Sequence, residues 1–362
     1  MSADLPFACA CGKVAGAIRD ADARQGTRMI CHCCDRVTFT KGRELLRCGV
    51  KRGFALLSLA LALAACVAPQ PPVPRASAAV LDAARANAPS ASAWVEHCTD
   101  WDDWDKRAQP FRVHGDTYHV GTCGISAVLI AGAEGHVLID SGTRDGARVV
   151  LSNIRTLGFQ PQNLRAVLTS HEHFDHVGGL WWLHQNTGAP VVTSPAALTV
   201  IRSGQADPAH PQFGMHEPMR ALHDVPVSAA QPGTALTLAG HDLLPVATPG
   251  HTPGALTWQW ESCEGGDCKS IVYADSLSAV SRDDYRFSDH PEYVQAYRGG
   301  LARLAALDCD ILLTPHPSAS GMRSKLVAGD LESGMDCAAY AADRLSLLDA
   351  RLEQERTREQ AR

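Results

Sequence analysis

The sequence predicts an α/β fold in which two mixed β-sheets pack face to face and helices cover their outer sides. Short apolar or alternating runs of strand type occur in both halves of the chain. A helical segment follows these runs in each half. The order of strands followed by a helix in both halves favours two sheets that pack against each other, with the helices on their outer sides. With 362 residues and 45% hydrophobic content, the chain can bury a large core.

Charge and cysteine content restrict the class of protein. The formal net charge is −6 and no Lys/Arg-rich run occurs, which argues against a nucleic-acid partner. Of the 13 cysteines, the six after residue 66 are widely spaced and even in number, which is typical of disulfides in an oxidising compartment. The first set is Cys9, Cys11, Cys31, Cys33, Cys34, Cys48 and Cys66, and the second is Cys98, Cys123, Cys263, Cys268, Cys309 and Cys337.

Residues 1–49 differ in character from the rest of the chain. The clusters Cys-Ala-Cys-Gly at 9–12 and Cys-His-Cys-Cys at 31–34 have zinc-cluster spacing. They resemble the start of the glutathione-dependent formaldehyde-activating (GFA-like) zinc family, over a stretch too short to complete that fold. We interpret the segment as a non-native or remnant extension and not a folded domain. A small working zinc module is the alternative.

Residues 50–66 have the pattern of a secretory signal peptide. A basic segment at 50–53 precedes an apolar run at 54–65 that is short for a membrane-spanning helix. Because signal peptides act at the N-terminus, we expect translation to begin near Val50, read from a GTG codon. Any other valine codon at that position would contradict this hypothesis.

The end of this segment leaves two routes of export open. The sequence Leu-Ala-Ala-Cys at 63–66 resembles a bacterial lipobox, which would tether the chain to a membrane through lipidated Cys66. Plain secretion with cleavage near Ala-Ser-Ala at 76–78 is the alternative. Both predict a periplasmic protein. Residues 67–92, rich in Ala and Pro, are predicted to be a linker before a domain that spans 93–356.

The first half of this domain is expected to begin near Trp94. Trp101, Trp104 and Phe111 are expected to anchor its edge, and a helix over about 144–157 is expected to end at Gly158. Apolar and β-branched runs predict strands at 126–130, 136–140, 166–169 and 191–193. The segment 204–226 contains many Pro and His residues without periodicity, which predicts a long loop of the kind that forms a lid or pocket wall in enzymes.

The second half repeats this strand-rich character. Helices are predicted at about 291–307 and 331–353. The predicted strands are 235–238, 243–247, 255–260, 270–274 and 310–314.

A cluster of metal-ligand residue types joins a predicted strand to a helix. The segment 170–179 reads Ser-His-Glu-His-Phe-Asp-His-Val-Gly-Gly, directly after the strand 166–169. Imidazole and carboxylate are usual ligands of Zn²⁺. The pair His171 and His173 suits one metal, and Asp175 with His176 suits a second. A histidine-rich surface turn is the alternative, which the position between a strand and a helix disfavours.

Two later histidines occur in the same local context. His251 lies in a turn fixed by Pro and Gly after the strand 243–247, and His316 directly follows the strand 310–314. A lone histidine in a turn is more often a surface residue than a ligand. Because both histidines lie at strand ends, as the first cluster does, we interpret them as ligands.

These residues together resemble a known family. The motif His-x-His-x-Asp-His at 171–176, the turn Pro-Gly-His-Thr-Pro-Gly at 249–254 and the histidine at 316 are similar to those of the metallo-β-lactamases, over roughly residues 94–345. The segment 273–279 has no cysteine where other subclasses carry a zinc-binding one, which is similar to subclass B3. The resemblance implies an αββα sandwich with the site at one edge of the sheets.

The resemblance also implies a cofactor, a substrate and a mechanism. Two Zn²⁺ ions would share a hydroxide that attacks the strained amide carbonyl of a β-lactam antibiotic and confers resistance, without a covalent intermediate. Asp175 would also orient the nucleophile, Ser276 would bond near the second zinc, and Ser278 would meet the substrate carboxylate. The implied ligands are His171, His173 and His251 for the first zinc and Asp175, His176 and His316 for the second.

Other polar and aromatic residues near the motif are assigned supporting roles. Glu172 is expected to point away from the metals. Asp140, after the strand 136–140, is expected to brace the ligand loops through hydrogen bonds. Trp181 and Trp182 are interpreted as helix core or groove wall, not as substrate contacts.

The later cysteines are assigned to disulfides in the same framework. Cys263 and Cys268 bracket a hairpin signal, Glu-Gly-Gly-Asp, so their sulfurs are expected to lie close together. Cys309 and Cys337 match a disulfide of subclass B3 by resemblance. Cys98 and Cys123 are then left as a pair. Zinc ligation by these cysteines is the alternative, but no CxxC pair supports it.

Three other functions remain as alternatives. A thioesterase or lactonase of the glyoxalase II type would bridge its metals with Asp275, so a position of Asp275 between the metals would favour it. Oxidoreductase relatives place a carboxylate at the third motif position, where this chain has His173. A non-enzymatic zinc-binding or scaffold protein would need an incomplete ligand set, and this set is complete.

Overall fold

The computed structural model describes residues 5–8, 15–18, 28–30, 37–39, 77–216 and 218–360. The chain divides into two units, 1–68 and 69–362. In the first unit the described segments are four short strands that pair antiparallel, β1 with β2 and β3 with β4. Their bounds are β1 (Leu5–Ala8), β2 (Ala15–Ile18), β3 (Arg28–Ile30) and β4 (Val37–Phe39). The predicted signal peptide with Cys66, and the cysteines of the segment that resembles the GFA-like family, lie outside the described residues.

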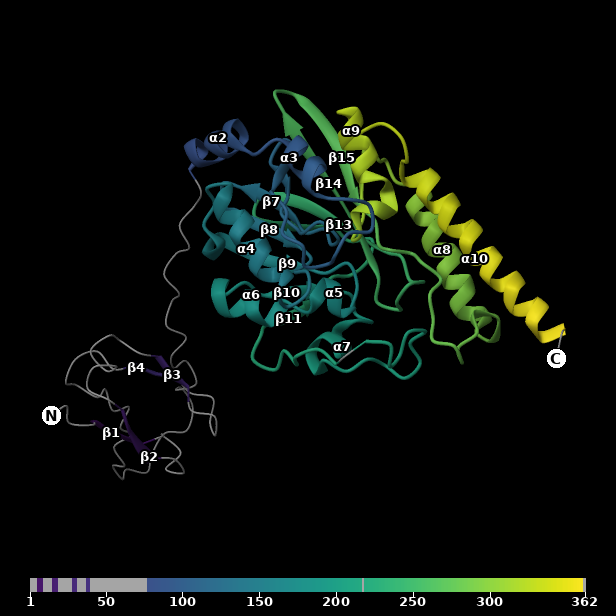
Figure 1. The fold of residues 1–362 in the computed structure, drawn as a ribbon, viewed down its shortest axis with the longest axis horizontal. Coiled ribbons are helices and arrows are strands. Elements are labelled where there is room, and N and C mark those ends of the chain that lie inside the picture. The colour runs from purple at the N-terminus through teal and green to yellow at the C-terminus, as the bar shows by residue number, and fades with distance from the viewer. Residues whose placement is uncertain are drawn as a thin grey trace, which may run out of the picture. The chain divides into compact units, whose positions relative to one another are not determined.

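The second unit contains a seven-stranded sheet with the order β11-β10-β9-β8-β7-β6-β5. Figure 1 labels the neighbouring strands β7 to β11 of this sheet. The strands from β8 to β11 run parallel, and β5, β6 and β7 add to them antiparallel. The bounds are β5 (Phe111–His114), β6 (Thr117–His119), β7 (Val128–Gly132), β8 (Gly135–Ile139), β9 (Leu164–Leu168), β10 (Val191–Thr193) and β11 (Val227–Ala229).

A five-stranded sheet with the order β12-β13-β14-β15-β16 forms the second layer. Its strands pair antiparallel except for β15 and β16, which are parallel. The bounds are β12 (Leu236–Leu238), β13 (His241–Ala247), β14 (Leu256–Glu264), β15 (Asp267–Tyr273) and β16 (Ile311–Leu313).

The two sheets pack face to face because each strand has apolar side chains on both sides. Alternate residues point into the core between the sheets, and the residues between them point into the core under the outer helices. On β8, Val137 and Ile139 join the core between the sheets, whereas Leu138 joins the core under the outer helices. On β15, Ile271 and Tyr273 point inward and Val272 points outward in the same way. Strands buried on both faces need continuous apolar runs, which is the pattern in the sequence. The predicted αββα sandwich is confirmed.

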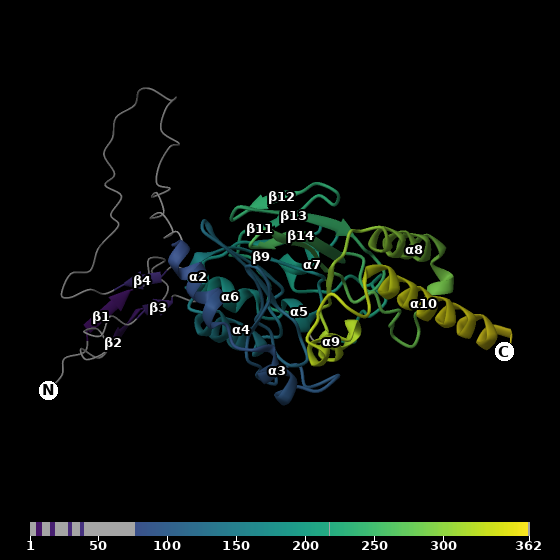
Figure 2. The ribbon, with the colours of Figure 1, turned by 90° about the horizontal axis from the view of Figure 1, so that it is seen from above.

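Helices cover both outer faces. The helices α4 (Gly146–Thr156), α6 (Leu180–Thr187) and α7 (Leu198–Ser203) contribute to the core on the outer side of the seven-stranded sheet. The helices α8 (Pro291–Ala305) and α10 (Cys337–Gln360) cover the five-stranded sheet and lie side by side in both views (Figures 1 and 2). The helix α4 ends before Gly158, whose φ of +86° favours glycine.

Several elements differ from the sequence-based expectation. The second part of the predicted linker forms the helix α2 (Ala78–Asn87), since Ala is the strongest helix former, and a further helix, α3 (Ala91–His97), spans the predicted boundary between linker and domain. The last helix begins at Cys337, not near Leu331. Trp101 and Trp104 do not anchor the domain edge: they are 69% and 40% exposed, whereas Phe111 is buried. The remaining short helices are η1 (Pro161–Asn163), α5 (Phe174–Val177), η2 (Phe287–Asp289), η3 (Pro317–Ser320) and α9 (Met322–Ala328).

Three disulfides link the later cysteines as predicted. Cys98 bonds to Cys123, Cys263 to Cys268 across the β14–β15 hairpin, and Cys309 to Cys337. The last bond ties the start of α10 to the segment before β16. Within the described residues, no helix is both long and apolar enough to cross a membrane.

His119 at the end of β6 makes the stability of this fold dependent on pH. Its ring stacks on Phe111, with centroids 5.0 Å apart, and neither ring nitrogen has a hydrogen-bond partner among the described residues. Burial lowers the pKa of His119 to about 3. In the unfolded chain a histidine has a pKa of about 6.5, so below that pH the unfolded state binds the extra proton.

We therefore expect acid to destabilise the wild-type protein more than His119→Phe. The contribution of a neutral buried His119 is complete above pH 6.5 and is lost as pH falls toward 3, at about 1.4 kcal/mol per pH unit. Urea unfolding from pH 7 to pH 4, with chelator present to remove metal effects, measures this slope in both proteins. Equal slopes would show that His119 does not contribute.

Candidate metal centre

The ligand loop lies at the carboxyl ends of two parallel neighbours, β8 and β9. The residue after β8 is Asp140, which has a φ of +63° and is fully buried. Its carboxylate accepts hydrogen bonds from the backbone N–H and hydroxyl of Ser170, both at 2.7 Å, and from the hydroxyl of Tyr273 at 2.9 Å. Asp140 therefore ties the start of the ligand loop to the end of β15, as the predicted bracing role requires.

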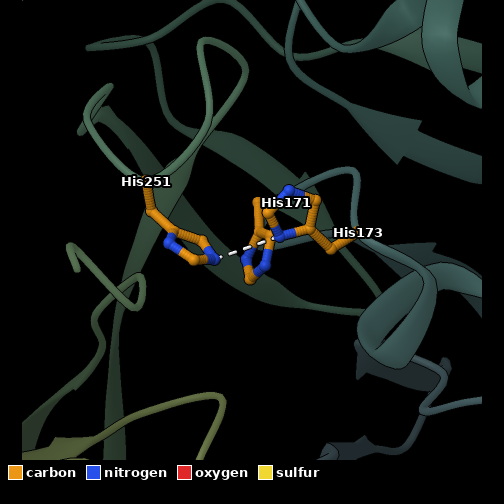
Figure 3. Close-up of side chains that lie close together, drawn as sticks. All are labelled: His171, His173 and His251. Carbon is orange, nitrogen blue, oxygen red and sulfur yellow. Dashed lines mark hydrogen bonds between the residues drawn. The ribbon is translucent and has the colours of Figure 1, made fainter. Parts of the chain in front are cut away.

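Three histidines meet at one point of this edge. His171 and His173 come from the loop after β9, and His251 comes from the turn after β13. Their ligand atoms lie within 4.8 Å of one another. Figure 3 shows the ring of His251 facing the other two rings across the gap between their loops, with its Nε2 3.0 Å from Nδ1 of His173. The structure thus brings together the residues expected to hold the first zinc.

A second group of possible metal ligands has His171 in common with the first. His171, Asp175 and His176 also have ligand atoms within 4.8 Å of one another. Oδ2 of Asp175 lies 2.9 Å from Nε2 of His176 and 3.3 Å from Nε2 of His316. His316, which follows β16, is the most exposed member, with a side chain that is 20% accessible. All six residues predicted as ligands therefore surround one site.

The surrounding groups determine which ring nitrogens face the site. Oδ1 of Asp275 lies 2.8 Å from Nδ1 of His171, and Oγ of Ser278 lies 2.8 Å from Nδ1 of His251. Oxygens beside Nδ1, which for His251 include the carbonyl oxygen of Ser278 at 3.2 Å, favour a proton on Nδ1 and the lone pair on Nε2. In His171, Nε2 is buried and has no hydrogen-bond partner in the described part of the chain. In this tautomer the Nε2 atoms of His171 and His251 can donate their lone pairs to a metal ion.

The electrostatics of the cluster fit a bound cation. Burial, together with the neighbouring imidazoles, lowers the pKa of His171 and His173. Burial raises the pKa of Asp175, but His176 and His316 outweigh that effect and hold it well below its usual range. Neutral imidazoles and a carboxylate are the donor set that Zn²⁺ prefers. Because buried nitrogens without partners are costly, a metal ion would satisfy the buried Nε2 atoms of His171 and His173, which have no hydrogen-bond partner among the described residues.

Glu172 lies inside the motif but does not face the metal donors. It is 4% exposed, and its carboxylate accepts hydrogen bonds from the hydroxyl of Thr252 at 2.7 Å and the backbone N–H of Gly254 at 3.1 Å. Glu172 therefore joins the loop that carries His171 to the turn that carries His251.

The long loop 204–226 contributes polar groups that the motif did not reveal. The rings of His210 and His216 have centroids 5.0 and 4.9 Å from that of His173. The amide of Gln212 lies between Nδ1 of His251, at 3.3 Å, and Nε2 of His216, at 3.2 Å. The sequence indicated a pocket wall here, and the density of histidines in the loop was the available signal.

An open cleft of about 350 Å³ leads to the metal donors. On one side Trp101 and Trp104 lie near His316, with ring centroids 6.2 and 6.0 Å from it. Both predicted substrate contacts, Ser276 and Ser278, line the cleft. The remaining lining residues are His173, Asp175, Gln212, His216, His251, Val280 and Arg344.

A two-sheet sandwich with outer helices and a buried cluster of imidazoles and carboxylate at the strand ends defines a metal-binding α/β protein. The chain belongs to the metallo-beta-lactamase superfamily, since residues 120–316 match the model of that family. This match spans both the ligand loop and His316.

Solved structures of related proteins indicate the subclass within this superfamily. The MIM-2 metallo-beta-lactamase is 49% identical, with a TM-score of 0.68, over 74% of this chain and 98% of its own. MEM-A1, a subclass B3 metallo-beta-lactamase from a soil metagenome library, is 36% identical, with a TM-score of 0.67, over 71% of this chain and 100% of its own. The resemblance to subclass B3 is confirmed. A probable metallo-hydrolase of Bacillus subtilis (strain 168), YflN, is 24% identical over 50% of this chain and 74% of its own.

Proposed function

We propose that the protein is a zinc-dependent hydrolase of β-lactam antibiotics. The observation that carries the proposal is the convergence of five imidazoles and one carboxylate at the end of an open cleft. The names of MIM-2 and MEM-A1 as metallo-beta-lactamases support the substrate class. The proposed ligands are His171, His173 and His251 for one zinc and Asp175, His176 and His316 for a second.

The chemistry assigns separate tasks to the side chains. Zinc, when bound, lowers the pKa of water from about 16 to about 7 and so supplies hydroxide at neutral pH. Asp175, whose Oδ2 lies 2.9 Å from Nε2 of His176 and 3.3 Å from Nε2 of His316, lines the cleft and would orient the attacking water. Ser276 and Ser278 line the cleft, which supports the proposal that they bind the substrate. A proton on Nδ1 of His251 would make Oγ of Ser278 the acceptor and leave the hydroxyl hydrogen of Ser278 to donate to the substrate.

The position of Asp275 argues against the glyoxalase II type of function. In that class the corresponding carboxylate would lie between the metals. Here Asp275 contacts Nδ1 of His171, on the side of the ring away from the nitrogen that faces the site. Burial raises the pKa of Asp275 to about 6, and His251 opposes that shift. Its contact with His171 suits a group that orients a ligand.

Location in the cell is a separate part of the proposal. The signal-type segment 50–66 and the disulfides suit export to the periplasm, where a β-lactam hydrolase would confer resistance. Fractionation of cells that express the gene, with lipid labelling of Cys66, tests export and tether together. Unprocessed protein in the cytoplasm would contradict this part.

The proposed activity predicts metal-dependent turnover. Purified protein with zinc is expected to hydrolyse nitrocefin and imipenem, to lose this activity in a chelator and to regain it with added zinc. Elemental analysis is expected to find two zinc ions per chain. Failure to turn over either compound at full zinc loading would overturn the assignment.

A further inference from the structure

The cleft contains one permanently charged cation. Among the described residues that line it, Arg344 is the only lysine or arginine. Arg344 comes from the long C-terminal helix α10, far along the chain from the metal donors. It shares the wall of the cleft with Ser276, Ser278 and Val280.

The helix α10 is fixed to this wall one turn before Arg344. The hydroxyl of Tyr340 donates to the carbonyl oxygens of Ser276, at 2.7 Å, and Asp275, at 3.2 Å. Tyr340 and Arg344 are four residues apart, so they lie on the same face of the helix. The guanidinium carbon of Arg344 is 5.0 Å from the centre of the Tyr340 ring, a cation–π distance. Tyr340 therefore sets the position of the guanidinium beside the serine segment.

The existing ion pair leaves Arg344 able to bind a ligand. Its Nε, at 2.9 Å, and its Nη2 both contact the same oxygen of Asp343, Oδ2. The Asp343 side chain is 43% exposed and that of Arg344 is 15% exposed. An ion pair with such an exposed partner is screened by water and contributes little. A planar guanidinium offers five N–H donors and binds carboxylates in pairs of hydrogen bonds.

We propose that Arg344 is a specificity-determining residue that binds the carboxylate of the substrate, together with the hydroxyl of Ser278. This inference rests on the proposed β-lactam hydrolase function. The substrates of that function carry a carboxylate next to the lactam ring, and a fixed cation at the cleft wall would orient the ring toward the metal donors.

The test pairs a change in the protein with a change in the substrate. Arg344→Gln is compared with the wild type on nitrocefin and on a neutral ester of nitrocefin. On nitrocefin we expect Arg344→Gln to raise KM about tenfold, because one partly exposed charge-assisted hydrogen bond is lost. We expect kcat to change less than about twofold. On the ester, the wild type and Arg344→Gln are expected to have equal KM values. Arg344→Lys is expected to recover part of the KM on nitrocefin.

Two controls separate this inference from the proposed function. Arg356→Gln lies on the same helix, and Arg356 also pairs with a neighbouring acid, Glu353, but it does not line the cleft. It is expected to behave as the wild type. The zinc content of Arg344→Gln is expected to match that of the wild type.

Each outcome has one meaning. If the wild type hydrolyses neither compound at full zinc loading, the proposed function fails. If the wild type is active but Arg344→Gln raises the KM of nitrocefin and of its ester equally, or raises neither, the role of Arg344 is overturned. A lower zinc content in Arg344→Gln would also overturn it, since the residue would then act on the metal donors.

Discussion

Asp175→Asn is expected to remove most of the activity and one bound metal ion. The carboxylate of Asp175 contacts the ring nitrogens of His176 and His316, and it is the only carboxylate among the six proposed ligands. An amide in its place carries no charge to balance a cation. Polarisation by a metal ion is worth several kcal/mol in the transition state, and a loss of about 4 kcal/mol corresponds to a roughly thousandfold slower reaction.

Two measurements check this prediction. Nitrocefin turnover gives the activity, and elemental analysis of dialysed protein is expected to show about one zinc fewer per chain than in the wild type. The matched control is Asp145→Asn: Asp145 is 65% exposed before α4 and pairs with Arg148. A variant Asp175→Asn that retains both zinc ions and full turnover would remove Asp175 from the ligand set.

The expected ligand set could be assembled from the sequence because each segment that carries ligands comes within a few residues after a strand. His171 and His173 follow β9, His251 follows β13, and His316 follows β16. Strands buried on both faces appear as short apolar runs, so their ends can be found without knowledge of the pairing. Once two sheets pack face to face, loops at one edge come together. Local pattern and overall architecture therefore agree on one site.

Residues that reach the site from distant elements could not be found in this way. Arg344 is one arginine among several on α10, and only the packing of Tyr340 against the segment 275–276 brings it to the cleft. Trp101 is expected from the sequence to anchor the domain edge because tryptophan is large and apolar. Its backbone has a φ of +55°, and its N–H donates to the hydroxyl of Ser318, which leaves the ring exposed at the cleft. Such placements depend on tertiary contacts that no local pattern encodes.

Glu172 shows how a residue outside the ligand set can still control the metal centre. The sequence indicated that it does not bind metal, and the structure adds the partners to which it points, Thr252 and Gly254. Gly254 approaches so closely that a Cβ there would lie 2.6 Å from the Glu172 carboxylate. The carboxylate therefore fixes the separation between the loop that carries His171 and His173 and the turn that carries His251.

Glu172→Ala is accordingly expected to weaken metal binding without removing any ligand. Two donors, the Thr252 hydroxyl and the Gly254 N–H, would lose their buried acceptor, which costs about 1–3 kcal/mol for each unsatisfied group. Partners that orient metal ligands typically change metal affinity by about 10- to 100-fold. Glu172→Gln keeps one acceptor oxygen and is expected to lie between Glu172→Ala and the wild type.

Competition with a chromogenic chelator measures the zinc affinity of each variant independently of turnover, and denaturant unfolding of the metal-free protein measures the cost to the fold. Glu292→Gln, at an exposed position in the first turn of α8, is the matched control. If Glu172 acts through the position of His251, the spacing of the metal donors changes in Glu172→Ala while the fold persists. The loss of zinc affinity is then expected to be larger than the loss of folding stability alone would cause. Zinc affinity equal to that of Glu292→Gln would show that the two loops hold the three histidines in place without this carboxylate.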